Sequence, residues 1–204
     1  DVVEGQGQEK SNDPLHDLEI IRERIRNELM EGEANDAVVG ALMKSMKNNG
    51  SWPNINYDDV SRTGFEHSRH LSNMLTMSLA FRQSSSVHYQ DKELKGTINQ
   101  AIDFWLDNDF ICDNWWWNQI GTPRRLVEVF LVMDEHITDS RKRKAAPIIG
   151  RANLDAWGAR PGGDRIKIAA ILGKAALFNR DTTTLRKVIH TMNEEIHFAY
   201  QRGT

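Results

Sequence analysis

The stretch NWWWNQIGTPRRLVEVFLVM, residues 114–133, decides the fold class of this chain. Its second half is typical of a helix that starts at Thr122-Pro123, because proline is favoured in the first turn, where its missing N–H is not needed. Apolar residues then recur at spacings of three and four, the period of one helix face, at Leu126, Val129, Phe130 and Met133. Three consecutive tryptophans stand in the first half, and we expect this triplet to occupy a loop before the helix.

The helical period continues on both sides of this stretch. Asp13-Pro14, Asn35 and Thr182 are start signals ahead of apolar residues at the same spacing, and Asn48-Asn49-Gly50 is a stop signal. The expected helices cover about residues 14–29, 36–47, 65–81, 92–106 and 122–133, the region around 140–154, the region after 164 and the region from 182. Since no window shows the alternating period of a strand, the sequence predicts an all-α protein of about seven to nine helices in antiparallel hairpins.

Three long loops separate the expected helices, at residues 50–64, 107–121 and 155–164. In a stack of helical hairpins, long loops at one end usually form the functional face. No short repeat with matching residues is present, which disfavours the regular solenoid families. Residues 1–12 are polar and rich in glycine, and we expect a flexible tail there, ahead of one helical domain over residues 13–204.

The composition is ordinary for a globular domain of 204 residues, with 39% hydrophobic and 27% charged residues. A net charge of −3 gives no support for nucleic-acid binding, and no apolar run nears the roughly 20 residues that span a bilayer. The single cysteine, Cys112, excludes an internal disulfide and a cysteine-based zinc site. No metal-ligand spacing and no glycine-rich phosphate loop stand out, so we expect no metal and no cofactor.

The tryptophan triplet, Trp115–Trp117, has two interpretations. Tryptophan is usually a packing residue, but three adjacent rings cannot all point into one core, so at least one faces outward and could form a binding platform. A sugar ring offers an apolar C–H face that matches an indole. Its hydroxyl groups match the paired donor and acceptor atoms of amides such as Asn114, Asn118 and Gln119.

Three segments carry a resemblance to polysaccharide lyase family 8, the lyases that act on chondroitin, hyaluronan and xanthan. The run at 114–133 resembles the family's "NWW–x–x–x–I–G–x–P" segment. In the same order as in the family, Gly50-Ser51-Trp52 with Ile55-Asn56-Tyr57 resembles the early "GSW…I–x–Y" loop, and residues 162–169 resemble its "G–A/G–N–R–x–D–I–A" segment. The resemblance spans about residues 15–200.

This resemblance implies an incomplete α/α toroid that binds an acidic polysaccharide of the chondroitin sulfate or hyaluronan type, with β-sheet domains beyond it. Such lyases cleave by β-elimination: an Asn neutralises the uronate carboxylate, and a His and a Tyr transfer protons, helped by an Arg and a Glu. Trp115 and Trp116 match the family's aromatic patch, and Asn114 matches the amide before it. The resemblance also implies a monomeric, secreted or periplasmic bacterial protein whose signal peptide has been removed.

The chain departs from the family pattern at Asp164, which stands where the neutralising Asn is expected. An ionised Asp would repel a uronate unless a proton or a cation intervenes, and it could instead simply cap the helix that follows. The family's catalytic His and Tyr fall beyond Thr204, and we interpret the chain's own histidines at 67, 70, 190 and 197 as core or surface residues. We therefore expect this chain alone to bind sugar weakly and to catalyse no elimination.

Cationic side chains form two groups. Arg124, Arg125, Arg160 and Arg165 flank the expected binding loops, and the planar donor fork of arginine suits carboxylate and sulfate, so we predict substrate contacts from Arg124, Arg160 and Arg165. The run SRKRK at residues 140–144 is either a solvated helix face or a contact for a polyanion.

Two rival functions remain open. A glycoside hydrolase on an α/α toroid would need two carboxylates roughly 6.5–9.5 Å apart for inversion. Asp113 and Asp164 are the candidates in the loops. A non-catalytic helical protein could also bind carbohydrate with the same tryptophans.

Overall fold

The structure is a computed structural model that describes the backbone of residues 13–201 and the side chains of residues 13–196. This range is all helical and contains no strand, which confirms the predicted fold class. The α-helices are α1 (Pro14–Leu29), α2 (Asp36–Ser45), α3 (His67–Arg82), α4 (Lys92–Asn108), α5 (Thr122–Met133), α6 (Asp139–Ile149), α7 (Gly163–Asn179) and α8 (Thr182–Gln201). A π-helical turn covers Trp117–Gly121, and a 3₁₀ turn covers Asp134–His136. The expected tail at residues 1–12 and the side chain of His197 lie outside the described residues.

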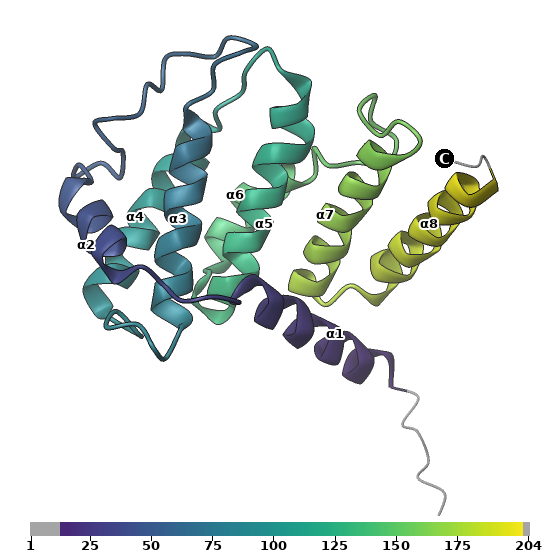
Figure 1. The fold of residues 1–204 in the computed structure, drawn as a ribbon, viewed down its shortest axis with the longest axis horizontal. Helices are drawn as coiled ribbons and strands as arrows, with labels where there is room; N and C mark the ends of the chain where they lie inside the picture. Colours follow the sequence, from purple (N-terminus) through teal and green to yellow (C-terminus); the bar gives the residue numbers. More distant parts are fainter. Residues whose placement is uncertain (1–12, 202–204) are drawn as a thin grey trace, which may run out of the picture.

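The helices pair as hairpins and form two layers. α3 packs with α4, α5 with α6 and α7 with α8, while α3, α5 and α7 also lie side by side as one row. α4 and α6 contact each other behind this row (Figure 1). α1 contacts α5, α7 and α8, and α2 packs on α3. These antiparallel hairpins are the arrangement that the helical period predicted.

The three helices of the front row run in the same direction. Their N-termini lie at one end of the molecule, together with the connecting segments 46–66, 109–114 and 150–162 (Figure 1). Their C-termini lie at the opposite end, where α1 crosses (Figure 1). The C-termini of α4 and α6 lie at this loop end too, because segments 109–114 and 150–162 follow them, so helix dipoles of both signs meet there.

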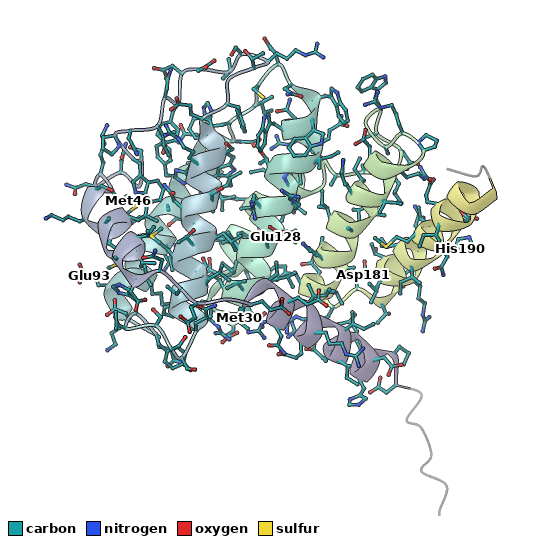
Figure 2. All side chains as sticks on the ribbon, in the orientation of Figure 1. Met30, Met46, Glu93, Glu128, Asp181 and His190 are labelled. Carbon is teal, nitrogen blue, oxygen red and sulfur yellow. The ribbon has the colours of Figure 1, made fainter. Side chains whose placement is uncertain are left out.

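Helix α5 forms the centre of the core. All its residues from Leu126 to Met133 are buried, including the acidic Glu128, whose side chain is 7% exposed. Glu128 Oε1 lies 2.6 Å from Lys174 Nζ on α7, and Oε2 lies 3.1 Å from Arg125 Nη1 (Figure 2 labels Glu128). A buried carboxylate without such partners would be strongly destabilising, so the pairing lets α5 and α7 pack closely.

The basic run at 140–144 binds another helix of the same chain. Arg141 donates to both carboxylate oxygens of Asp103 on α4, at 2.8 and 2.7 Å, and Lys144 pairs with Asp107 one turn further along. Arg151 continues this ladder with Asp109. Two cations of the run, Arg141 and Lys144, therefore hold α6 to the acidic face of α4, which weakens the polyanion interpretation of the run.

Candidate functional site

The segment between α2 and α3 builds a closed aromatic cluster at the loop end. Trp52 is 1% exposed, and its Nε1–H donates to the carbonyl of Leu42 at 3.1 Å. The Tyr57 hydroxyl accepts from the Trp52 backbone N–H at 3.1 Å and lies 2.9 Å from His70 Nδ1. His70 Nε2 lies 2.9 Å from the carbonyl of Ala101, which fixes the proton on that nitrogen. The Gly-Ser-Trp motif of the sequence therefore serves packing in this structure.

The two histidines of this cluster are buried structural groups. His67 Nε2 lies 2.7 Å from the Tyr57 carbonyl, and its ring stacks on Phe65 at 4.6 Å. Burial lowers the pKa of His67, and it lowers the pKa of His70 to about 4. Both residues are 0% exposed, so a bound polymer cannot reach either ring. The interpretation of these two residues as structural is confirmed.

The tryptophan triplet is helical, so the prediction of a loop at these residues is wrong. Asn114 is the cap: its Oδ1 accepts from the backbone N–H of Trp116 at 3.1 Å. Trp115 and Trp116 form the first helical turn, and the π turn at Trp117–Gly121 runs directly into α5. A wider turn suits Pro123, which lacks an N–H and would collide with the carbonyl four residues earlier in a regular α-helix. The true start signal is therefore Asn114, ahead of the expected one at Thr122.

The indole rings of the triplet point in different directions, and each is half-buried. Trp117 packs inward against Phe65 with ring centroids 5.5 Å apart, and Trp116 meets Trp117 edge to face at 5.0 Å. Trp115 points to the segment before α7, where it meets Trp157 edge to face at 5.3 Å. Trp157 is 68% exposed. All three tryptophans of the triplet keep part of their surface exposed, so the triplet does not fit wholly into the core. Trp157 is a residue that the sequence analysis missed.

Two glycines allow these aromatic groups to approach the backbone. A Cβ on Gly158 would lie 2.2 Å from Gln119 Oε1 and 2.5 Å from the ring of Trp115. A Cβ on Gly121 would lie 2.2 Å from the ring of Trp117. The N–H of Gly158 also donates to Gln119 Oε1 at 3.1 Å, so the segment before α7 is fastened to the triplet.

The segment before α3 is fastened to the other side of the triplet. Asn114 Nδ2 donates to the carbonyl of Arg62 at 3.2 Å, and the N–H of Asp113 donates to the carbonyl of Val60 at 2.9 Å. All three connecting segments of the loop end therefore form one surface. We call its exposed and half-exposed members Trp115, Trp116, Trp157 and Arg160 the aromatic face.

Arg160 is the cation of the aromatic face. Its guanidinium carbon lies 4.9 Å from the ring centroid of Trp115 and 5.1 Å from that of Trp157. Arg160 Nη2 lies 3.2 Å from Asp164 Oδ2, and Lys167 Nζ lies 3.4 Å from the other oxygen of Asp164. Asp164 is the second residue of α7, and the cap of that helix is Gly162, with φ of 93°. The interpretation of Asp164 as the helix cap is therefore wrong, and two cations compensate its charge.

Several other predicted site residues hold the segments together. The amide of Asn118 accepts from the N–H of Cys112 at 3.1 Å and donates to its carbonyl at 2.7 Å. Arg165 Nε lies 3.0 Å from Glu195 on α8, whose other oxygen accepts from the N–H of Gly162 at 2.8 Å. Arg124 is half-buried in the first turn of α5. These contacts give Asn118 and Arg165 a role in shaping the loop end.

The described residues give little support to the rival chemistries. Asp164 is engaged by Arg160 and Lys167, so it is not placed as a free acid opposite Asp113. Within the described part of the chain, no three His, Cys, Asp or Glu side chains are grouped to hold a metal ion. No helix there has the length and apolar character that a membrane crossing requires.

The sequence and the fold both match proteins of known type. The sequence model described as polysaccharide lyase family 8, N-terminal alpha-helical domain, matches residues 18–203. Chondroitinase-AC of Pedobacter heparinus is 30% identical over 116 residues, which are 56% of this chain and 17% of that protein. Hyaluronate lyase HylB of Enterococcus faecalis is 25% identical over 142 residues, which are 60% of this chain and 14% of that protein.

Solved structures share the fold. A chondroitinase AC lyase studied as enzyme–oligosaccharide complexes superposes with a TM-score of 0.79 and 24% identity, over 85% of this chain and 26% of that one. The Streptomyces coelicolor A3 chondroitin AC lyase in complex with chondroitin sulphate gives a TM-score of 0.66 and 18% identity, over 93% and 25%. The helical hairpins described above are therefore an incomplete α/α toroid, as predicted.

Proposed function

The chain belongs to polysaccharide lyase family 8, in its N-terminal helical domain, and on that premise we propose that it binds the substrate of a lyase that cleaves uronic-acid polysaccharides by β-elimination. The substrate class is the chondroitin or hyaluronan type. The observation that carries the proposal is the aromatic face, where Trp157 is 68% exposed beside the stacked cation Arg160. The chain spans only 17% and 14% of the two relatives, so the activity of the whole protein is part of the proposal.

The chemistry of the aromatic face suits an acidic sugar polymer. An exposed indole packs against the C–H face of a sugar ring, while a guanidinium binds carboxylate or sulfate through paired N–H donors. These features support an acidic polymer over a neutral one.

The relatives support the same substrate class. Their names refer to chondroitin and to hyaluronate, which are both acidic polysaccharides. Acidic polysaccharides do not cross a bilayer, so a secreted or periplasmic location is part of this proposal. A monomeric state is also part of it.

At its loop end, the described part of this chain offers binding and positioning groups but no exposed pair of His and Tyr. His67 and His70 are buried, and the hydroxyl of Tyr57 is shared between Trp52 and His70. His190 is exposed on α8, where it pairs with Glu194 at 3.2 Å, away from the loop end (Figure 2). An elimination needs a base for the C5 proton and an acid for the leaving oxygen, each contributing about 10²–10⁴-fold. We therefore propose that the purified 204-residue chain produces no unsaturated sugar.

A binding measurement tests this function. The purified chain is titrated with hyaluronan and chondroitin oligosaccharides and with a neutral oligosaccharide of the same length. We expect binding of the acidic ones alone, and up to about tenfold weaker binding for Trp157→Ala, given about 0.5–1.5 kcal/mol for a stacked aromatic contact. The control is Val87→Ala, because Val87 is 79% exposed in the segment between α3 and α4 at the opposite end. Equal affinity for the neutral oligosaccharide would contradict the proposal.

The ultraviolet absorbance of the unsaturated product separates binding from turnover in the same samples. We expect no rise in this absorbance with the 204-residue chain. A steady rise that follows the protein through purification would show that a base among the described residues, such as His190, acts in the reaction.

A further inference from the structure

Arg160 is held from three sides although its side chain is 54% exposed. Its guanidinium lies against two indoles that stand nearly perpendicular to each other, at 86°, and its Nη2 contacts Asp164. An exposed arginine normally samples many rotamers, and ordering it costs conformational entropy on binding. Because the folded chain already restrains Arg160, much of this cost is met before any ligand arrives.

The ion pairs around Asp164 do not use up all of the positive charge of its partners. Arg160 and Lys167 carry two positive charges against the one negative charge of Asp164, which leaves one positive charge. The neighbouring Arg165 is compensated separately by Glu195. A guanidinium has five N–H donors, and Asp164 accepts from one of its nitrogens, so donors remain for an incoming anion.

From these observations we propose that Arg160 is the anion-recognising side chain of the aromatic face. It binds the carboxylate or sulfate of a sugar unit that stacks on Trp157, and Asp164 is a positioning residue that holds the guanidinium against the two indoles. This inference rests on the proposed function and names the group that selects acidic sugars. It also gives the carboxylate of Asp164 a role that is compatible with an acidic ligand, since both of its oxygens face cations.

The first experiment compares two variants that remove the same charge. Arg160→Gln is measured beside Arg143→Gln, because Arg143 is an exposed arginine on α6 within the same basic run as Arg141. For an unsulfated hyaluronan oligosaccharide we expect Arg160→Gln to weaken binding about tenfold to a hundredfold, the size of one charge-assisted contact. Arg143→Gln should change it less than about twofold, since exposed charges at a distance are screened by salt. Equal effects of the two variants on hyaluronan and also on a chondroitin sulfate oligosaccharide would overturn the proposal.

A second ligand shows whether Arg160 binds the carboxylate or the sulfate of the sugar. Chondroitin sulfate oligosaccharides carry sulfate as well as carboxylate, whereas hyaluronan carries carboxylate alone. If Arg160 binds the carboxylate, Arg160→Gln weakens both ligands by the same factor. If it binds the sulfate, only the chondroitin sulfate is weakened. Unchanged affinity for both ligands would overturn the assignment of Arg160.

The positioning role of Asp164 is tested by a double-mutant cycle. Asp164→Asn should change the affinity when Arg160 is present and have no effect in the Arg160→Gln background, because its only proposed action is through Arg160. Asp164→Glu should keep most of the wild-type affinity, since it restores the carboxylate. The same effect of Asp164→Asn in both backgrounds would show that Asp164 meets the ligand directly and would overturn this part.

Arg160→Lys separates the charge of Arg160 from its planar donor fork, because lysine keeps the charge but lacks the fork that stacks on indole. We expect an intermediate affinity with an unchanged urea midpoint, and wild-type affinity would overturn the role of the fork. The proposed function fails separately, when the wild-type chain binds no acidic oligosaccharide at all. If the wild-type chain binds and Arg160→Gln binds equally well, only the assignment of Arg160 fails.

Discussion

Two groups of aromatic side chains lie at the same end of this molecule, and they differ in how their polar atoms are satisfied. In the closed cluster, Trp52, Tyr57 and His70 bond to one another and to two backbone carbonyls, and the ring of Trp52 is 1% exposed. In the aromatic face, Trp157 is 68% exposed and a cation stacks on its ring. Aromatic content alone therefore does not identify a binding surface. Accessible ring faces beside charged donors are the more informative sign.

The largest expected effect belongs to the closed cluster. Trp52→Ala should lower the free energy of unfolding by about 3–5 kcal/mol, because it removes a fully buried ring and leaves a cavity. Urea denaturation of both proteins measures this difference. A loss below about 1 kcal/mol would show that the segment before α3 contributes little to stability and would remove the contrast between the two groups.

Acid should weaken the closed cluster through His70. Burial lowers its pKa in the folded protein to about 4, below the usual 6.5, so the unfolded chain binds the proton more tightly. The contribution is fully present above pH 6.5 and is lost as the pH falls towards 4, up to about 3 kcal/mol. We expect His70→Gln to flatten the pH dependence of the urea midpoint in this window. An unchanged slope would mean that the pKa of His70 is the same in the folded and the unfolded chain.

The aromatic face should be sensitive to a single added methyl group. Gly158→Ala places a Cβ against Gln119 and Trp115. We therefore expect the free energy of unfolding to fall by about 1–3 kcal/mol and the binding of acidic oligosaccharides to weaken. The control is Gly163→Ala, where a Cβ would meet nothing within 4 Å. If both variants behave alike in urea and in titrations, the close approach at Gly158 has no consequence.

The smallest expected effect on stability is at the most exposed ring. Trp157→Ala should change the free energy of unfolding by less than about 0.5 kcal/mol, since most of its ring already meets water. The urea midpoint, measured beside that of Trp52→Ala, checks this. A large loss would assign Trp157 to packing, and the aromatic face would then resemble the closed cluster.

The fold could be predicted from the sequence because each helix carries its own signal. Asp13, Asn35 and Asp91 cap α1, α2 and α4 with their side chains, and the apolar period follows each cap. The expected start of the third helix at about residue 65 precedes the observed start at His67, because Phe65, with φ of 78°, adopts a conformation that no local pattern indicates. The helical start at Trp115 was missed because Thr122-Pro123 is the stronger conventional signal, while the cap at Asn114 precedes a rare π turn.

The site was predicted only in part because its roles depend on contacts across the chain. The outward position of the tryptophan triplet followed from local reasoning, since adjacent rings cannot share one core. Local reasoning did not show which amide side chains are already hydrogen-bonded within the protein. The partners of Asn118 and Gln119 are backbone groups of Cys112 and Gly158, which only the folded chain brings close. The exposure of Trp157 likewise depends on where the segment before α7 folds back.

The distribution of tryptophans gives this protein its own optical reporter. Two of the six tryptophans, Trp52 and Trp105, are only 1% and 0% exposed, and the other four lie in or beside the aromatic face. Buried indoles fluoresce at shorter wavelengths and resist soluble quenchers, whereas Trp157 should fluoresce at longer wavelengths and be quenched first. The perpendicular pairs Trp116–Trp117 and Trp115–Trp157 should also give a near-ultraviolet dichroism signal that disappears when either partner is replaced. Occupancy of the aromatic face could thus be followed on the unlabelled protein, as a blue shift and a loss of quenching.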